Sequence, residues 1–575
     1  MENSEIAKIF WEISEFLELK GDNPFKIRAY QKAARNIETL SQNLDDIYKR
    51  GGIAALRELP GIGQDLSEKI ESFIKTGKVD TYDKLRREFP AGFINLLEIP
   101  SLGPKTAMLL YKKFKVGSVA ALEKLTRSGK LEGLPGFGTK KTENILKGIN
   151  LKKRVKGRFL LSEALAYAEP IVAELEKLKA VDRLLPAGSL RRRQETIGDL
   201  DFLVTSKDPA RVMSGFTSLP QVERTLVKGG TKASVILKNG MQADLRVVKE
   251  KSFGAAAHYF TGSKGHNIHI RQLAQKKGWK VSEYGIFNTA GKQIGGRTEQ
   301  EMFSKFGLQY IPPELREMRG EFEAAAKREI PELIEPIDIR GDLQMHSDHS
   351  DGSSTIEAMA AAANKLGYEY IAITDHTRST RVAGGQTEKE FLKELEDIDR
   401  INRKLNGFRV LKGVEVDILP DGTLDFSDEV LKRAEVVLAA VHSNFKMEKS
   451  KMTKRIIRAL ENKYVNLLAH PTGRLIGKRE PYEVDIEAVI QAAKRTGTVL
   501  EINAYPERLD LSDLHCRRAK EVGVLLAINT DSHSPLQLGT MKYGVMTARR
   551  GWLEKSDVIN TLPVGKLLKI LARKR

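Results

Sequence analysis

Short apolar runs recur in the second half of this chain, and each is followed by a side chain that can bind a metal ion. The runs are residues 339–343, 370–373, 410–414, 436–441, 465–469, 499–500 and 524–528. Their lengths suit buried strands. Parallel strands closed into a barrel gather functional residues at their carboxyl-terminal rim. The pattern predicts a TIM-like barrel over residues 338–575, and its imidazole and carboxylate donors favour zinc, manganese or iron over calcium.

The length and charge of the chain indicate several domains and a polyanionic partner. At 575 residues it is too long for one hydrophobic core, and an excess of 95 Lys and Arg over 76 Asp and Glu gives a net charge of +19. The alternative is a basic protein that is merely soluble. A single cysteine, Cys516, argues against a disulfide framework. Because no apolar run is long enough for a membrane span and the acidic N-terminus does not resemble a signal peptide, we expect a cytoplasmic, nucleoid-associated protein.

One short element occurs three times within the first 155 residues, which have helical periodicity. It reads LPGIG at 59–63, IPSLG at 99–103 and LPGFG at 134–138. A glycine turn that leads into a helix presents backbone N–H groups to a phosphate. The repeats resemble helix-hairpin-helix turns that bind the DNA backbone, and the alternative is three ordinary helix–helix turns. The residues predicted to contact DNA are Gly61, Gly63, Ser101, Gly103, Lys105, Gly136, Gly138 and Lys140.

A cluster of three carboxylates is predicted between residues 199 and 244. Asp199 and Asp201 are two apart in an expected strand, so they share one face. Asn239-Gly240 predicts a hairpin turn, and Asp244 in the returning strand can join them. Clustered carboxylates repel one another unless cations lie between them, and two magnesium ions there would clamp an in-line phosphoryl displacement. The alternative is a solvated acidic strand.

The segments around this cluster resemble a family X DNA polymerase. They are Gly188-Ser189 with Arg191-Arg192, Gly198 to Asp201, Asp244 to Arg246, and Tyr259 to Ser263. The Gly-Ser turn and the arginines also offer donors for a triphosphate in their own right. The resemblance covers residues 1–317. It implies that Asp199, Asp201 and Asp244 bind two Mg²⁺ (or Mn²⁺) ions, and that Asp244 helps to activate the primer 3′-hydroxyl.

The same resemblance implies a site for the incoming nucleotide. Its members are Gly188, Ser189, Arg192, Tyr259, Phe260, Gly262, Lys264 and Asn267. Tyr259 and Phe260 would line the sugar pocket, and Asn267 matches a position that contacts the base in the minor groove. Lys264 stands where the family commonly has an acidic residue, and we hypothesise that it binds triphosphate before the template arrives.

The first 90 residues resemble the lyase domain of that family, through segments 23–30 and 61–70. Lys69 aligns with the lysine that forms a Schiff base while it excises a 5′-deoxyribose phosphate. Asp65, Asp80 and Thr81 stand where basic residues are common. The resemblance predicts binding of DNA ends and leaves open whether Lys69 is a nucleophile or a solvated helix lysine.

The barrel resembles the PHP (polymerase and histidinol phosphatase) domain, through motifs at 344–352, 374–376, 413–417, 441–443, 469–471 and 531–533. The resemblance implies two or three Mn²⁺ or Zn²⁺ ions and a metal-activated water that attacks a phosphoester. The implied ligands are His346, Asp351, His376, Glu415, His442, His470, Asp531 and His533. Asn503 and Arg474 are further candidates for phosphate contact. Gln344 replaces a usual His with a weaker ligand, and the alternative is a barrel that only stabilises the polymerase.

These patterns predict a multidomain α/β and α+β chain. The expected order is a helical lyase-like domain with a helix-hairpin-helix (1–90), fingers with a second such element (91–155), a mixed-sheet nucleotidyltransferase palm (156–250), a thumb (251–317), a linker (318–337) and a PHP barrel of seven strands and helices (338–575).

The resemblances to a family X DNA polymerase and to a PHP domain imply gap-filling DNA synthesis in repair, including base-excision repair. The barrel would act as a 3′–5′ exonuclease, with AP endonuclease or 3′-phosphatase activity also possible. The expected partners are gapped or nicked DNA and deoxynucleoside triphosphates, and the expected state is a monomer. One alternative is a DNA-end scaffold with an inactive barrel, which would hold no stoichiometric manganese or zinc. Another is a template-independent nucleotidyltransferase, which would ignore the template base.

Overall fold

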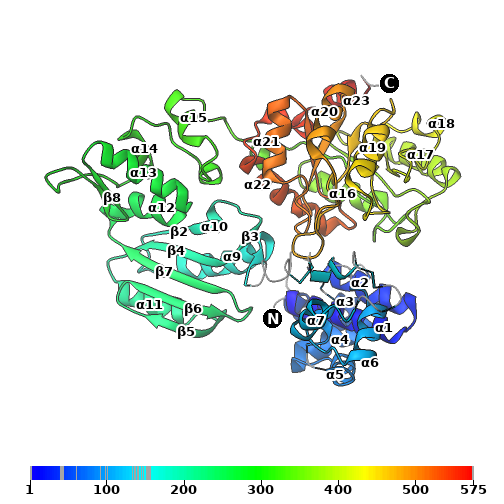
Figure 1. The fold of residues 1–575 in the computed structure, drawn as a ribbon, viewed down its shortest axis with the longest axis horizontal. Helices are drawn as coiled ribbons and strands as arrows, with labels where there is room; N and C mark the ends of the chain where they lie inside the picture. Colours follow the sequence, from blue (N-terminus) through cyan, green and yellow to red (C-terminus); the bar gives the residue numbers. More distant parts are fainter. Residues whose placement is uncertain are drawn as a thin grey trace.

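The fold is that of a computed structural model. It describes residues 3–38, 44–59, 61–90, 92–97, 99, 102–131, 134, 137–138, 141–143, 145–146, 148–149 and 157–572. We call residues 3–149 the N-terminal region, 158–248 the palm, 250–317 the thumb and 341–572 the barrel. Figure 1 shows the thumb above the palm on the left, and the barrel above the blue helices of the N-terminal region on the right.

The N-terminal region is built from amphipathic helices. They are α1 (Asn3–Lys20), α2 (Pro24–Glu38), α3 (Leu44–Arg57), α4 (Gln64–Thr76), α5 (Asp80–Arg87), η1 (Ile94–Leu96), α6 (Pro104–Phe114) and α7 (Val119–Arg127). Ile6, Phe10 and Ile13 recur at helical spacing in α1 and are fully buried. One hydrophobic cluster continues from Ile6 to Ile149, so the described helices of this region share a core.

The palm is a mixed sheet flanked by helices. Its elements are β1 (Phe159–Leu160), α9 (Leu161–Glu176), β2 (Arg183–Pro186), α10 (Gly188–Arg191), β3 (Thr196–Ile197), β4 (Asp199–Thr205), α11 (Pro209–Thr217), β5 (Val222–Lys228), β6 (Lys232–Leu237) and β7 (Gln242–Val248). The main sheet has the order β2-β4-β7-β6-β5, in which β4 and β7 are parallel and the other pairs antiparallel. In β7 Ala243, Leu245 and Val247 are buried with α9 and α11, which leaves the opposite face for Asp244.

The thumb packs small helices against a three-stranded sheet. Its elements are η2 (Glu250–Ser252), α12 (Phe253–Thr261), α13 (Lys264–Lys276), β8 (Lys280–Ser282), β9 (Gly285–Phe287), β10 (Gln293–Gly295), α14 (Glu299–Ser304) and η3 (Pro313–Leu315). Gly254 in α12 touches the backbone of Thr298, where a Cβ would lie 2.1 Å from the carbonyl carbon. This close approach requires glycine and seats α12 against the start of α14.

The barrel has seven parallel strands in chain order. The strands are β11 (Gly341–Asp342), β12 (Tyr370–Ile373), β13 (Arg409–Asp417), β14 (Val436–Ala440), β15 (Leu467–Leu468), β16 (Val499–Asn503) and β17 (Leu526–Asn529). Beyond the paired strands, Asp531 N donates to Gln344 O at 3.1 Å and His346 N donates to Ser532 O at 2.7 Å, which brings the last strand against the first. The expected fold class is confirmed by this nearly closed barrel, the mixed palm sheet and the helical N-terminal region.

Helices connect and surround the barrel strands. They are α15 (Glu321–Lys327), which precedes the barrel with η4 (Pro336–Asp338), then α16 (Ile356–Lys365), η5 (Arg381–Ala383), α17 (Glu388–Asn402), α18 (Asp428–Leu431), α19 (Lys449–Leu460), α20 (Ile486–Thr496), α21 (Asp513–Val522), η6 (Pro535–Thr540), α22 (Met541–Arg550), η7 (Lys555–Asp557), η8 (Ile559–Thr561) and α23 (Val564–Ala572). Leu509 and Tyr543 of the barrel join the hydrophobic cluster of the palm, and Trp552 joins that of the thumb. The barrel is therefore packed against both through shared apolar contacts.

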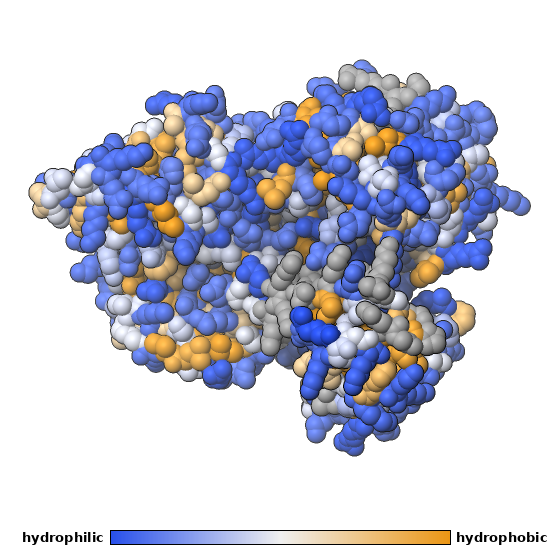
Figure 2. Space-filling view, viewed as in Figure 1, coloured by the Kyte–Doolittle hydropathy of each residue, from blue (hydrophilic) through white to orange (hydrophobic). Residues whose placement is uncertain are grey.

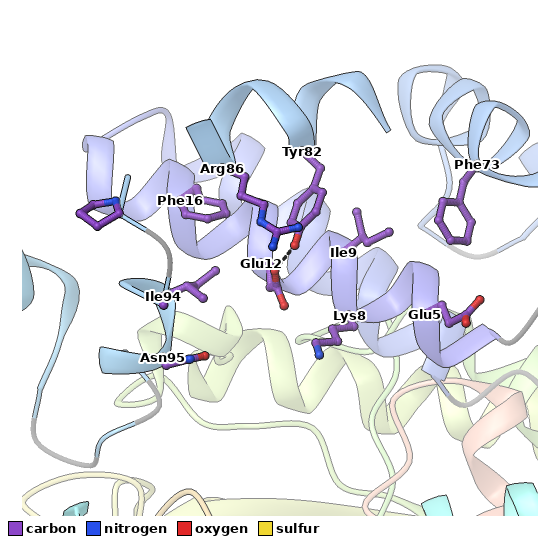
Figure 3. Close-up of a pocket in the computed structure, with 12 residues that line it drawn as sticks. Glu5, Lys8, Ile9, Glu12, Phe16, Phe73, Tyr82, Arg86, Ile94 and Asn95 are labelled. Atoms are coloured by element: carbon purple, nitrogen blue, oxygen red, sulfur yellow. Dashed lines mark hydrogen bonds between the residues drawn. The ribbon is translucent and has the colours of Figure 1, made fainter. Parts of the chain in front are cut away.

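The outer surface offers few apolar features. The face in Figure 2 is mostly hydrophilic, and its apolar patch at the lower left lies over β5, where Leu226 and Val227 are exposed. A pocket of about 530 Å³ lies in the N-terminal region between α1, α5 and residues 90–95, where Tyr82 donates a hydrogen bond to Glu12 (Figure 3). None of the predicted site residues lines it. None of the helices in the described ranges has the length and apolarity needed to cross a bilayer.

Two candidate active sites

The three palm carboxylates predicted to bind metal lie together. Asp201 is paired in register with Asp244 across β4 and β7, and Asp199 is paired with Gln242. Gln242 Nε2 donates to Asp244 Oδ1 at 3.0 Å, which fixes that carboxylate. Burial and the charges of Asp199 and Asp244 raise the pKa of Asp201 to about 7. Burial and Asp244 also raise the pKa of Asp199. Such mutual repulsion is relieved by a divalent cation between the groups, so the donor set fits magnesium or manganese.

The predicted Gly-Ser turn lies directly against this cluster. Ala187 N donates to Asp201 O at 2.7 Å, which ties the turn to β4. Gly188 has φ +61°, and a Cβ there would lie 2.3 Å from Asp201 Oδ2. Any other residue would therefore collide with a predicted metal ligand. Ser189 is the next residue of this turn, in α10.

Two neighbouring arginines connect the turn to the thumb. Arg192 Nε donates to Glu317 Oε1 at 3.0 Å, and its Nη1 donates to Thr261 O. Arg191 Nη1 donates to Glu299 Oε1 at 2.9 Å, and Arg316 Nη1 donates to the same oxygen at 2.6 Å. Burial alone would raise the pKa of Glu299, but Arg316 and Arg191 outweigh it and lower this pKa to about 2.

The predicted nucleotide residues of the thumb lie close to Arg192. Gly262 follows α12 with φ +72°, and a Cβ there would lie 3.2 Å from Arg192 Nη1. Tyr259 and Phe260 meet edge to face with ring centroids 5.2 Å apart. Asn267 Nδ2 donates to Tyr259 O at 2.7 Å, so it stabilises that segment. Lys264 is the first residue of α13. Their contacts with a nucleotide stay predictions.

The predicted barrel ligands gather around Glu415. His470 Nε2 lies 3.0 Å from Glu415 Oε1, and His442 Nε2 lies 3.1 Å from the same oxygen. His346 Nε2 and His376 Nδ1 lie 3.3 Å and 3.5 Å from Glu415 Oε2. Ligand atoms within 4.8 Å of one another form overlapping groups: His346, Asp351, His376 and His533; His376, Glu415 and His442; His346, Glu415 and Asp531. The structure thus brings all eight predicted ligands into one cluster.

The chemistry of this cluster fits metal ions. Buried polar atoms normally have hydrogen-bond partners. Among the described residues, the buried ring atoms His346 Nδ1 and His470 Nδ1 have no hydrogen-bond partner. Burial alone would raise the pKa of Glu415, but His376 and His442 hold it well below its usual range. Imidazole and carboxylate donors with unused lone pairs suit zinc or manganese. Gln344 is fully buried beside them, with both side-chain polar atoms also unpartnered.

Supporting residues were only partly visible in the sequence. Asp417 Oδ1 lies 2.7 Å from His442 Nδ1 and so orients that ring. Asn503 Nδ2 donates to Asp531 Oδ2 at 3.1 Å, and Arg508 Nε lies 3.6 Å from the same atom. Arg474 Nη2 donates to Glu195 Oε2 of the palm at 2.7 Å. Asn503 and Arg474, both considered for phosphate contact, thus bond to protein groups. Arg508 lies in a loop after β16, and no spacing pattern in the sequence predicted a role for it.

The three glycine turns of the N-terminal region share one geometry. In each, a buried apolar residue donates its N–H to the residue three positions earlier, and the glycine carbonyl accepts from the N–H four positions later. The first bonds are Ile62 N to Leu59 O (3.1 Å), Leu102 N to Ile99 O (3.0 Å) and Phe137 N to Leu134 O (2.9 Å). The second are Ser67 N to Gly63 O (2.9 Å), Ala107 N to Gly103 O (3.0 Å) and Thr142 N to Gly138 O (3.2 Å).

The space around these turns suits a close approach by another molecule. A Cβ added at Gly63, Gly103 or Gly138 would meet no other described atom within 4 Å. Gly61 adopts φ +74° in the first turn, and Lys105 lies in the first turn of α6. The predicted DNA contacts Ser101, Gly136 and Lys140 lie outside the described residues.

Comparisons with known proteins agree with this arrangement of parts. A helix-hairpin-helix domain matches residues 1–79, a SAM-like helix-hairpin-helix tandem 93–150, a DNA polymerase beta thumb 256–317 and a PHP domain 342–504. The chain is 41% identical over 563 residues to a protein of Bacillus subtilis named DNA polymerase/3'-5' exonuclease PolX, and the match covers 97% of each chain. The chain belongs to the PolX family.

The PolX family match is accompanied by shorter relatives. A probable phosphatase of a Thermoanaerobacter species is 32% identical over 234 residues, which are 39% of this chain and 89% of that protein. A probable phosphatase of Acetivibrio thermocellus is 33% identical over 195 residues, which are 32% of this chain and 76% of that protein. This chain therefore contains a segment that is similar to separate, shorter proteins named probable phosphatases.

The predicted lyase lysine has a partner in this PolX-family chain. Lys69 lies in α4, and its Nζ pairs with the Asp65 carboxylate one turn earlier. Its side chain is 17% exposed, whereas that of Asp65 is 71% exposed. A Schiff-base nucleophile acts as a free amine. The Lys69 Nζ is instead engaged by the Asp65 carboxylate, so the role of Lys69 as a nucleophile stays a prediction.

Proposed function

We propose that this PolX-family chain fills short gaps in DNA at the palm and removes nucleotides from the 3′ terminus at the barrel. The observation that carries the proposal is the presence of two separate ligand clusters in one chain. One holds Asp201 and Asp244 against the Gly188 turn, and the other surrounds Glu415. The name of the Bacillus subtilis relative combines the same two activities.

At the palm, Asp199, Asp201 and Asp244 would hold two Mg²⁺ or Mn²⁺ ions. Such ions stabilise the charge of an in-line phosphoryl displacement. Arg192 and the backbone of the Gly188 turn would bind the triphosphate, since a guanidinium and exposed N–H groups are its usual donors. Asp244 would then accept the proton of the primer 3′-hydroxyl.

At the nucleotide's other end, the thumb supplies the remaining contacts. Tyr259 and Phe260 would pack against the sugar, and Gly262 leaves room beside Arg192. Lys264 and Asn267 complete the contacts of the thumb, and Ser189 of the palm would join Arg192 at the triphosphate. Asn267 holds the aromatic segment through the Tyr259 carbonyl, and in this position Tyr259 would disfavour a 2′-hydroxyl.

At the barrel, the eight predicted ligands would hold two or three Mn²⁺ or Zn²⁺ ions. Metal ions in such a site generate hydroxide from water and polarise a phosphoester. His346 and His376 stack with ring centroids 4.4 Å apart, which fixes both rings. Because relatives of this segment are named probable phosphatases, 3′-phosphatase activity is a second candidate for this site. AP endonuclease activity, which cleaves a phosphodiester, is a further candidate that the notion of a metal-activated water also allows.

The DNA would be held by the glycine turns of the N-terminal region. Their open N–H groups at helix starts suit the phosphate backbone, and the net charge of +19 favours association with DNA. We propose gapped or nicked duplex and deoxynucleoside triphosphates as substrates, and a monomer, associated with the nucleoid, as the working state.

The test uses a one-nucleotide gap whose primer carries a 3′ mismatch and a 5′ label, with Mn²⁺ present. We expect Asp199→Ala/Asp201→Ala to trim the mismatch without extending the primer. We expect His376→Ala/His470→Ala to extend a matched primer without trimming a mismatched one. Trimming that survives the barrel variant would make the barrel structural, and nucleotide choice that ignores the template base would favour a template-independent transferase.

A further inference from the structure

A buried arginine of the barrel reaches the predicted nucleotide site. Arg550 is the last residue of α22, and its side chain is 4% exposed. Its Nη1 donates to Arg192 O at 2.6 Å and to Glu317 Oε1 at 3.1 Å. Its Nη2 donates to Asp513 Oδ2 at 2.7 Å. One guanidinium thus connects a barrel helix to the backbone of the palm and to a carboxylate at the end of the thumb.

Glu317 is shared between the barrel and the predicted triphosphate ligand. Its Oε1 accepts from Arg192 Nε at 3.0 Å, from Gln194 Nε2 at 2.5 Å and from Arg550 Nη1 at 3.1 Å. Glu317 is 12% exposed in its side chain, so these charge-assisted bonds form where water screens them poorly. A carboxylate that holds Arg192 competes with a triphosphate for the same guanidinium.

Arg550 limits the competition between Glu317 and a triphosphate for the Arg192 guanidinium. The Arg192 backbone is fixed by Arg550, while its side chain bonds to Glu317 and to the Thr261 carbonyl. Because Arg550 also bonds to the Glu317 carboxylate, the negative charge is divided between two cations. Without Arg550, the Glu317 charge would no longer be shared with a second arginine. It would act on Arg192, and Gln194 would remain as a neutral hydrogen-bond donor to Glu317.

We propose that Arg550 is a positioning residue for the incoming triphosphate: it fixes the Arg192 backbone and shares the Glu317 charge, which weakens the hold of Glu317 on the Arg192 guanidinium and lets a triphosphate compete for it. The inference deepens the proposed function, because it rests on Arg192 as a triphosphate ligand. It gives the barrel a part in DNA synthesis that is independent of the barrel's own hydrolytic chemistry.

The experiment compares nucleotide kinetics in gap filling by the full-length protein. Arg550→Met should raise the KM for the deoxynucleoside triphosphate roughly tenfold with little change in kcat, because the undivided Glu317 charge then holds the Arg192 guanidinium; tenfold corresponds to about 1.4 kcal/mol. Its trimming of a 3′ mismatch should stay at the wild-type rate. Arg549→Met is the matched control: this neighbour bonds to Glu314 at 2.9 Å and to Ile334 O at 3.0 Å, and should leave the KM unchanged.

A rescue variant separates positioning from a merely structural role. Adding Glu317→Gln to Arg550→Met removes the competing charge and should return the KM towards the wild-type value. Glu317→Gln alone should lower the KM, and this variant tests the inference even if Arg550→Met fails to fold. An unchanged KM in Arg550→Met, or a raised KM that Glu317→Gln does not reduce, would overturn the inference.

Arg192→Ala distinguishes this inference from the function on which it rests. If Arg192→Ala leaves the KM unchanged, the proposed triphosphate site is wrong and the role of Arg550 falls with it. If Arg192→Ala raises the KM and Arg550→Met does not, the nucleotide site stands and the inference about Arg550 alone is wrong.

Discussion

Asp201 and Asp244 lie opposite each other on the parallel strands β4 and β7, where both side chains share a face with Asp199. Burial and the two neighbouring charges raise the pKa of Asp201 to about 7. The metal-free palm therefore contains a carboxyl group that is half protonated near neutral pH. A cation bound between these groups would compensate their charge, so the donor set fits a divalent ion.

We expect magnesium to bind the palm less tightly below pH 7, by up to about tenfold per pH unit, because it must displace the Asp201 proton. The folded pKa of Asp201 lies above its unfolded value of about 4. Protonated Asp201 therefore contributes fully to the free energy of unfolding of the metal-free protein below pH 4, and this contribution is lost as the pH rises through 7. Calorimetric titration with Mg²⁺ at pH 6 and pH 8 measures the difference. Asp201→Asn should abolish this pH dependence of Mg²⁺ binding. Equal Mg²⁺ affinities of the wild-type protein at pH 6 and pH 8 would contradict the expectation.

The sequence predicted those site residues whose position follows from local periodicity. Asp244 could be placed beside Asp201 because the alternation in β7 and the Asn239-Gly240 turn fix which side chains share a face. The barrel ligands could be grouped because parallel strands end at one rim. The contact between Arg550 and Glu317 could not be predicted, because these residues are 233 positions apart in the sequence and lie in different parts of the fold. Asn503 and Arg474 lay near the expected rim, but only the structure shows that they bond to Asp531 and Glu195.

Lys69 should be a poor lyase nucleophile while Asp65 accompanies it. The Asp65 carboxylate holds the Lys69 Nζ in an ion pair, so the nitrogen that must attack a sugar aldehyde is occupied. We expect weak borohydride trapping of the wild-type protein on a 5′-deoxyribose phosphate end, and several-fold stronger trapping of Asp65→Asn. Lys69→Ala should abolish trapping in both backgrounds. Equal trapping with and without the Asp65 charge would show that the ion pair does not restrain Lys69.

Gln344 should weaken one metal position of the barrel without removing the others. It is fully buried beside the ligand cluster, with both polar side-chain atoms unpartnered, and an amide is a weaker ligand than imidazole for zinc or manganese. We expect Gln344→His to bind one ion about tenfold more tightly, a difference of about 1.4 kcal/mol. Metal analysis after dialysis against a graded series of free Mn²⁺ measures this directly. His346→Ala, which removes a neighbouring ligand, should lower the metal content in the same series. If Gln344→His changes neither the affinity nor the number of ions, Gln344 does not face a metal, and the reason for its buried, unpaired amide lies elsewhere in the barrel.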